Sequence, residues 1–431
     1  MRNKTMNVKS SLVATLALGV AYVGVTSVVT LMPTRSAIAD EKKDDKKPSV
    51  SKELAKTLKA AQEAVQAKPP KYQDALAKLK EAESNPKKTP YDEHVINELS
   101  AYAYAHTNQL PEAAKANEAL INDGFTEQGE MPGRIKAVAV AYYQQKNYDK
   151  ALDYGNRAIK GGFADDDINT IVGQSYYLKG DWKGTLKFYQ PIVDADIKAG
   201  RQPKDISLQL LMSACAKLED ADCTQHALEK LVTYYPKPEY WKDLLYTMRQ
   251  DHALTASDKN TLQLFRLMAE VDVLAQADDY TEMAQIALDQ GSPGEAQHIL
   301  EKGFQKGVFA DQRTKDKNQR LLDSAKKVAA TDQPALPKIE KDADAAPTGD
   351  KDVAVGLAYL GYGQFDKAAD LLNKGLTKGG VKSDAEAHLL LGIAQLKGGH
   401  KDDAVKSFHA VKGDPALERL ANLWSLHAKQ A

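Results

Sequence analysis

Residues 352–380 read DVAVGLAYLGYGQFDKAADLLNKGLTKGG, and this stretch decides the fold. Its apolar residues follow the period of two short helices, with Tyr359 in the first helix, Phe365 at the turn and Ala368 in the second helix. A pattern of this kind that returns along a chain indicates stacked copies of one helix-turn-helix unit. Upstream copies are Tyr142, Tyr148 and Ala151, and then Tyr176, Trp182 and Thr185.

The small residue of each second helix recurs most regularly. When these small residues are aligned along the chain, two of the intervals between consecutive ones are close to double the others. Each of these two intervals predicts a hidden, degenerate unit. The first is expected around Thr261, with Phe265 after it; in the second, only one helix is clear, from about Arg313 to Val328. The aligned small residues are Ala75, Ala113, Ala151, Thr185, Ala227, Ala296, Ala368 and Ala404.

Glycines mark where many of these helices are expected to end. Glycine reaches the left-handed backbone conformation that closes a helix, because it has no Cβ atom to clash. The phrases NDGF, KGGF and EKGF each place a glycine in such a position. The predicted helix-ending glycines are Gly124, Gly162, Gly303 and Gly379.

One proline-containing segment is predicted to divide the repeats. Residues 331–350, TDQPALPKIEKDADAAPTGD, hold three prolines and no helical period, which predicts a linker or a long mobile loop. It separates a repeat array over 51–330 from a C-terminal pair of units, which together with a final helix occupies 351–431. That final helix, expected from Pro415 to Lys429, has one apolar face and is predicted to cap the open end of the stack.

The first 39 residues form a separate unit. Basic residues precede an apolar run from Leu12 to Met32, and Ala37-Ile38-Ala39 then supplies the small residues of a cleavage site. This order predicts a secretory signal peptide over 1–39, cleaved before Asp40. The length of the apolar run leaves a retained N-terminal membrane anchor as the alternative. Residues 40–50, DEKKDDKKPSV, are charged and are predicted to be a disordered lead-in.

Two cysteines, Cys215 and Cys223, are the only ones in the chain. Export to an oxidising compartment makes a disulfide between them chemically feasible. The separation spans a helix end and a turn, so the alternative is a buried helix residue and an unpaired turn residue. The sequence leaves both possibilities open.

The composition and motifs argue against several classes of function. The formal net charge is −1, so the chain has no strong field to attract nucleic acid or anionic lipid. The 9 histidines form no compact ligand cluster, and neither HExxH nor GxSxG occurs. Asp165, Asp166 and Asp167 directly precede an expected helix, where capping and the helix dipole account for them. We therefore predict no enzyme activity, no metal and no cofactor.

At these residues the chain resembles the tetratricopeptide repeat family of helix-turn-helix arrays. The resemblance extends over about 300 residues and implies an all-α solenoid of stacked repeats with a C-terminal capping helix. Small residues let the two helices of a unit approach, and aromatic residues fill the wider gap to the next unit. The clearest matches are Gly356, Tyr359, Phe365 and Ala368; Leu391, Gly392, Ala404, Phe408 and Pro415; and Gly173, Tyr176, Trp182 and Tyr189, with Thr185 in place of the usual alanine. Ala139, Tyr142, Tyr148, Ala151 and Ala158 match with alanine in place of glycine.

The resemblance also implies where a partner would bind. In tetratricopeptide arrays the first helices of successive units line a concave groove that contacts a protein or peptide. In the doublets Tyr142-Tyr143 and Tyr176-Tyr177, the first tyrosine matches the packing position and the second is expected to face the groove. The groove positions transferred to this chain are Tyr102, His106, Lys136, Tyr143, Gln144, Gln174 and Tyr177.

Together with the export signal, the chain looks like the bacterial envelope proteins that carry such arrays. The leading hypothesis is a non-catalytic periplasmic or secreted adaptor that binds a protein or peptide and, once the signal is cleaved, no membrane. The second is an inner-membrane-tethered array that assists an envelope translocation or chaperone machine. The third is a regulatory or catalytic component of an envelope enzyme. The sequence does not indicate the identity of the partner or the oligomeric state.

Overall fold

The computed structural model describes residues 48–430, and helices are the only regular secondary structure within that range. The predicted all-α helical repeat solenoid is confirmed. The predicted signal peptide and residues 40–47 of the predicted lead-in lie outside the described residues. The chain divides into two compact units, which we describe separately: unit 1 runs to Pro203 and includes Ser213–Asp220, and unit 2 comprises Lys204–Met212 and the chain from Ala221.

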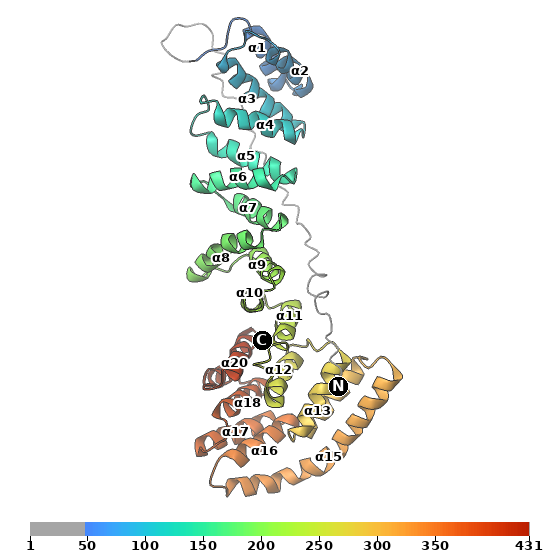
Figure 1. Ribbon diagram of the computed structural model, residues 1–431. Coiled ribbons are helices and arrows are strands. Elements are labelled where there is room, and N and C mark those ends of the chain that lie inside the picture. The colour runs from blue at the N-terminus through green and yellow to red at the C-terminus, as the bar shows by residue number, and fades with distance from the viewer. Residues whose placement is uncertain (1–47, 431) are drawn as a thin grey trace. The chain divides into compact units, whose positions relative to one another are not determined.

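Unit 1 is a stack of helix pairs in which each helix packs against the next along the chain (Figure 1). The first helices of successive pairs also touch, as α5 and α7 do. Its helices are α1 (Ala55–Gln66), α2 (Tyr72–Glu83), α3 (Pro90–His106), α4 (Leu110–Asn122), α5 (Met131–Gln144), α6 (Tyr148–Lys160), α7 (Asp166–Leu178) and α8 (Trp182–Lys198). The helix α9 (Asp205–Lys217) contributes residues to both units.

Unit 2 continues the pairing but contains one unpaired long helix and a final capping helix. Its helices are α10 (Ala221–Tyr234), α11 (Pro238–Met248), α12 (Asp258–Glu270), α13 (Ala277–Asp289), α14 (Pro293–Gln305), α15 (Gln312–Asp344), α16 (Asp350–Gly361), α17 (Phe365–Lys378), α18 (Asp384–Lys397), α19 (Lys401–His409) and α20 (Pro415–Gln430). The hidden unit predicted around Thr261 is the pair α11 and α12, in which Thr261 and Phe265 are both buried.

Small residues bring the two helices of each pair together. All eight aligned small residues are buried, and six of them, including Ala151 and Ala368, are completely inaccessible to solvent. Glycines of the first helices lie directly against the second helices. A Cβ atom on Gly392 would lie 2.5 Å from the Phe408 ring, and one on Gly356 would lie 2.8 Å from Leu372. Only close-packed backbones leave so little room, which explains the small residues that the sequence repeats.

Local signals begin and end the helices. Thr89 starts α3 with a reciprocal capping box, in which Asp92 N–H donates to the Thr89 hydroxyl at 3.1 Å and Thr89 N–H donates to the Asp92 carboxylate at 2.8 Å. Gly124, Gly162 and Gly379 have φ values of +78°, +74° and +73°, as predicted for helix-ending glycines.

The prediction for Gly303 is wrong. Gly303 lies inside α14 and is buried, because the Phe309 ring packs where its Cβ atom would be, 2.8 Å away. The turn falls at Gly307 instead, where φ is +68°.

The predicted linker at 331–350 is also wrong over most of its length. Residues 331–344 belong to α15, which continues through Pro334 and Pro337 and ends at Asp344. A proline inside a helix removes one backbone hydrogen bond, so the helix needs support from packing. That support is a stripe of buried residues that spans both prolines: Leu322, Ala325, Ala329, Leu336 and Ala343.

The C-terminal repeats do not form a separate domain, because they pack onto the middle of the chain within unit 2. The capping helix α20 contacts α19 and α18, as expected for a cap, and it also contacts α12 (Figure 1). We call the contact of α18 and α20 with the region around α12 the seam of unit 2. Polar contacts lie along it: Lys397 on α18 lies 2.6 Å from Glu270 on α12, and Arg419 on α20 lies 2.9 Å from Asp251. Gln430 donates to the carbonyl oxygen of Val232 at 2.9 Å. Unit 2 therefore closes on itself.

Three further features concern predictions made from the sequence. Cys215 is buried in α9, Cys223 lies in the first turn of α10, and both are disulfide-bonded. Within residues 48–430, no helix combines the length and the apolar character that crossing a membrane requires. The same residues contain no group of three histidine, cysteine or acidic side chains placed to hold a metal ion.

Candidate functional site

The predicted groove residues lie on the first helices of three successive pairs in unit 1. Tyr102 and His106 are on α3, the residues from Lys136 to Gln144 are on α5, and Gln174 and Tyr177 are on α7. Most are half-buried, while His106 and Gln144 are exposed. Of the packing members of the two tyrosine doublets, Tyr142 is buried, with 6% exposed, whereas Tyr176 is half-buried like the groove residues.

Lys136 links α5 to the beginning of α7. Its ammonium group donates to Asp165 at 2.5 Å and to Asp167 at 2.9 Å, and Asp165 also caps α7 by accepting from Ile168 N–H at 3.0 Å. Burial by itself would lower the pKa of Lys136, but the two carboxylates outweigh burial and raise it. The two aspartates therefore bind the Lys136 ammonium group, and Asp165 caps the helix as well.

Tyr143 makes the second link between α5 and α7. Its hydroxyl group donates to the side-chain oxygen of Gln174, and its ring lies 6.0 Å from the ring of Tyr148. Burial raises the pKa of Tyr143, so the hydroxyl stays protonated as a donor. Tyr142, its neighbour, donates instead to Glu118 on α4 at 2.6 Å, away from this contact.

Tyr177 carries the series on to α9. Its hydroxyl oxygen lies 2.7 Å from that of Ser213, which belongs to the part of α9 in unit 1. The Trp182 ring packs edge-on against the Tyr177 ring at 5.0 Å. Lys136 and the Tyr143–Gln174 pair thus link α5 to α7, and Tyr177 links α7 to α9. We call these four residues the first-helix row.

Tyr102 and His106 belong to a different cluster. Both rings contact Tyr72 on α2: His106 stacks on it at 4.9 Å with an interplanar angle of 4°, and Tyr102 lies 6.1 Å away. No contact in the described structure ties these two rings to Lys136 or Tyr143. The transferred positions therefore form two surfaces rather than one.

A buried charged cluster between α3 and α5 was not predicted. Arg134 is only 3% exposed; its guanidinium group lies 2.7 Å from Glu130 and 3.6 Å from Glu98. Burial raises the pKa of Glu98 despite the lowering effect of Arg134. Nearby, His94 lies 2.8 Å from the Asp123 carboxylate. Side chains of this kind look like solvated helix faces in a sequence, because only the packing of neighbouring helices, here α3, α4 and α5, buries them.

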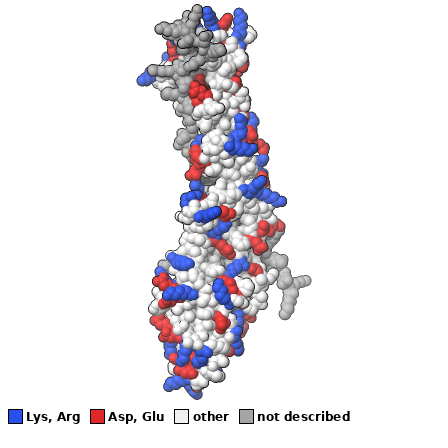
Figure 2. Space-filling view, turned by 90° about the vertical axis from the view of Figure 1, so that its left-hand side faces the viewer, with Lys and Arg blue, Asp and Glu red and all other residues white. Residues whose placement is uncertain are grey.

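The partners of the first-helix row were also missing from the prediction. Asp165 and Asp167 were assigned to capping alone, and Ser213 and Trp182 were not singled out as contacts of Tyr177. Asp165, Asp167 and Ser213 belong to the repeat that follows their partner's, so their pairing depends on how repeats stack, whereas Trp182 begins the second helix of the repeat that contains Tyr177. On the face of the molecule drawn in Figure 2, Lys and Arg side chains are intermixed with Asp and Glu.

Comparison with known proteins identifies repeats in part of the chain. A model of the tetratricopeptide repeat family matches residues 354–417, which contain α17, α18 and α19 and most of α16. This confirms the resemblance for the two units with the clearest sequence pattern. None of the curated proteins matches the chain.

Several solved structures are similar to the chain at low identity. A tetratricopeptide repeat protein from Parabacteroides merdae is 13% identical with a TM-score of 0.29, covering 70% of this chain and 99% of its own. The TPR2AB domain of yeast Sti1, solved in a complex with pHSP90, is 15% identical with a TM-score of 0.24, covering 70% and 100%. The pentatricopeptide repeat protein PPR10 from maize is 11% identical with a TM-score of 0.29, covering 87% and 61%. At sequence identities and TM-scores this low, neither a binding partner nor a function can be transferred to this chain.

Proposed function

We propose that this protein is a non-catalytic scaffold of the bacterial envelope that binds a protein or peptide along the first-helix row of unit 1. The observation that carries the proposal is the row itself, in which half-buried tyrosines and polar groups on successive helices are fixed by contacts between them. Side chains held in place before binding lose little conformational entropy when a partner arrives, which favours affinity.

The chemistry of the row suits an extended peptide. Tyrosine offers an apolar ring face together with a hydroxyl group, and it is enriched where binding energy concentrates. The Tyr143 hydroxyl and the Gln174 amide can bond to peptide groups, while Lys136 and its two aspartates provide charges at one end of the row. The row does not resemble a catalytic constellation, since no nucleophile is paired with a base in it.

A double substitution tests this assignment. We expect Tyr143→Ala combined with Tyr177→Ala to weaken binding of peptides selected from a displayed library by about tenfold or more, as measured by fluorescence anisotropy. Tyr143→Phe with Tyr177→Phe keeps the rings and separates ring contact from hydroxyl bonding. Tyr235→Ala, a half-buried tyrosine of unit 2, is the matched control. Unchanged peptide affinity in the alanine variant, with an intact circular dichroism spectrum, would refute the role of the row.

Export is the second part of the proposal, and the sequence of residues 1–39 supports it. N-terminal sequencing of the protein from a bacterial envelope fraction should find a chain that begins at Asp40, as expected for a periplasmic or secreted protein. A chain that keeps Leu12–Met32 would instead support the inner-membrane-tethered alternative, in which the array serves a translocation or chaperone machine.

A further inference from the structure

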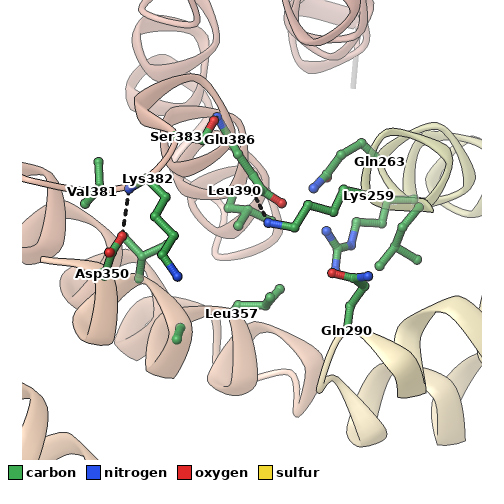
Figure 3. Close-up of a pocket in the computed structure, with 14 residues that line it drawn as sticks. Lys259, Gln263, Gln290, Asp350, Leu357, Val381, Lys382, Ser383, Glu386 and Leu390 are labelled. Atoms are coloured by element: carbon green, nitrogen blue, oxygen red, sulfur yellow. Dashed lines mark hydrogen bonds and ion pairs between the residues drawn. The ribbon is translucent and has the colours of Figure 1, made fainter. Parts of the chain in front are cut away.

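A cavity of about 240 Å³ lies inside unit 2, at the seam where the C-terminal repeats meet α12 (Figure 3). One wall comes from α12, which supplies Lys259, Gln263 and Arg266, and Gln290 reaches in from the end of α13. The opposite wall comes from α16 and from the beginning of α18 with the loop before it. No part of the proposed function uses this cavity.

The charges that line the cavity are balanced. Arg266 is neutralised by Glu295, which accepts two hydrogen bonds from its guanidinium group at 2.7 Å each. The remaining lining holds two cations, Lys259 and Lys382, and two carboxylates, Asp350 and Glu386. A lining of this kind complements a ligand that carries one charge of each sign better than it complements a simple anion or cation.

Among the described residues, each carboxylate accepts a hydrogen bond through one oxygen, and its other oxygen is left for a ligand. Asp350 accepts from the backbone N–H of Lys382 through Oδ1 at 2.7 Å, and Glu386 accepts from Lys259 through Oε2 at 3.2 Å (Figure 3). Lys382 is exposed, so its ammonium group is accessible to a ligand carboxylate.

Two glutamine amides provide the strongest evidence for a ligand. Gln263 is only 1% exposed, and its Oε1 atom has no hydrogen-bond partner among the described residues. A buried acceptor without a partner is destabilising, so its presence calls for an explanation. The side chains of Gln263 and Gln290 both extend toward the middle of the cavity (Figure 3). Two primary amides offer the donors and acceptors that a peptide group requires.

We propose that this cavity binds a small zwitterionic ligand of the dipeptide class. Its ammonium group would meet Asp350 and Glu386, its carboxylate would meet Lys382, and its peptide group would bond to the Gln263 and Gln290 amides. Leu262, Leu357 and Leu390 line the same cavity and provide an apolar surface for a side chain. The volume lies below the range of about 300–1,000 Å³ that is usual for ligand pockets, which favours so small a ligand.

The position of the cavity couples binding to the closure of unit 2. The ligand bridges α12 and α18, which the Lys259–Glu386 ion pair already connects across the seam. Since a ligand stabilises the conformation that binds it, dipeptide binding stabilises the contact between α12 and α18. The stability of this contact within unit 2 would then depend on the concentration of small peptides.

Calorimetric titration of the full chain with glycyl-leucine tests the proposal. We expect saturable binding with a Kd of about 1 mM or tighter, the affinity reached by ligands of this size. N-acetyl-glycyl-leucine and glycyl-leucine amide each lack one charge and should bind at least about tenfold more weakly. Tyr143→Ala with Tyr177→Ala should bind glycyl-leucine unchanged, so this result is independent of the first-helix row.

Gln263→Leu is the decisive variant. It removes the unpaired acceptor at similar volume, so without dipeptide its melting temperature should equal or exceed that of the unmodified chain. Its affinity for glycyl-leucine should nevertheless fall at least about tenfold. Gln319→Leu, at an exposed position of α15, is the matched control and should leave affinity unchanged.

A second variant keeps the proposal testable if Gln263→Leu does not fold. Lys382→Ala, at an exposed position, should weaken binding of glycyl-leucine but not of its amide, which has no carboxylate to lose. Three results would overturn the proposal: no saturable binding by the folded chain at about 10 mM dipeptide, unchanged affinity in both variants, or equal affinity for the free and the blocked dipeptides.

Discussion

Glu270→Gln should loosen the seam that closes unit 2. Glu270 lies on α12, where its carboxylate accepts from Lys397 of α18 at 2.6 Å and lies 3.8 Å from the His427 ring nitrogen of α20. One carboxylate thus holds two helices that lie far from α12 in the sequence. Its side chain is only 21% exposed, so solvent screens these contacts incompletely.

The pKa of Glu270 sets the magnitude of the effect. Burial alone would raise this pKa, but His427 and Lys397 outweigh burial and lower it from 4.5 to about 2. At about 1.4 kcal/mol per pKa unit this corresponds to an upper limit of about 3 kcal/mol, which partial exposure reduces to about 2 kcal/mol. Because the folded-state pKa is depressed, the stabilisation is complete above pH 4.5 and is lost as the pH falls toward 2.

Urea unfolding followed by circular dichroism measures this difference. We expect Glu270→Gln to lower the free energy of unfolding by about 2 kcal/mol at neutral pH, and the gap to the unmodified chain to narrow as the pH falls below 4.5. Asp403→Asn, which removes an exposed ion pair with Lys406, is the control and should have no measurable effect. Equal stabilities at neutral pH, or a gap that does not depend on pH, would refute the reasoning.

Four other outcomes are expected. Ala368→Leu should destabilise the chain by about 1–3 kcal/mol in thermal unfolding, because the fully buried alanine lies where α16 and α17 touch. Arg134→Met should lower the free energy of unfolding by about 3–5 kcal/mol at neutral pH, since it leaves two carboxylates without their cation. The loss should be smaller in acid, where those carboxylates take up protons, and a loss that does not change with pH would contradict this. Limited proteolysis should spare the bonds around Pro334, whereas rapid cleavage there would indicate a loop. Mass spectrometry without reductant should find the chain lighter by two hydrogen atoms, because Cys215 and Cys223 are both disulfide-bonded, and labelling of free thiols in the unreduced protein would contradict this.

The sequence-based predictions succeeded where the signal was local and periodic. Ala151 and Ala368 were assigned to helix contacts by their spacing, and both are buried there. Gly303 shows the limit of such reasoning, because its phrase EKGF looks like a helix end while a ring from the following turn requires a glycine inside the helix. In α15, the prolines suggested a break, but the buried stripe through Leu336 holds the helix together.

The candidate sites depended more heavily on long-range packing. The transferred positions include Tyr143, Gln174 and Tyr177, which make contacts from one first helix to the next, and also Tyr102, which belongs to another cluster. The contacts that complete the first-helix row, such as Ser213, come from the next repeat. No feature of the sequence singled out Gln263. A glutamine on a helix is ordinary, and it becomes unusual only when the fold buries its amide oxygen without a hydrogen-bond partner among the described residues.

The sequence by itself determined the helices, their pairing and the small residues at which paired helices touch. These features repeat within a few tens of residues, so periodicity, caps and glycines encode them locally. Only the tertiary structure decided that unit 2 closes on itself. Lys397 and Glu270 are 127 residues apart, and no local pattern relates two surface charges at that distance. The cavity with its unpaired glutamine exists only because those distant helices meet.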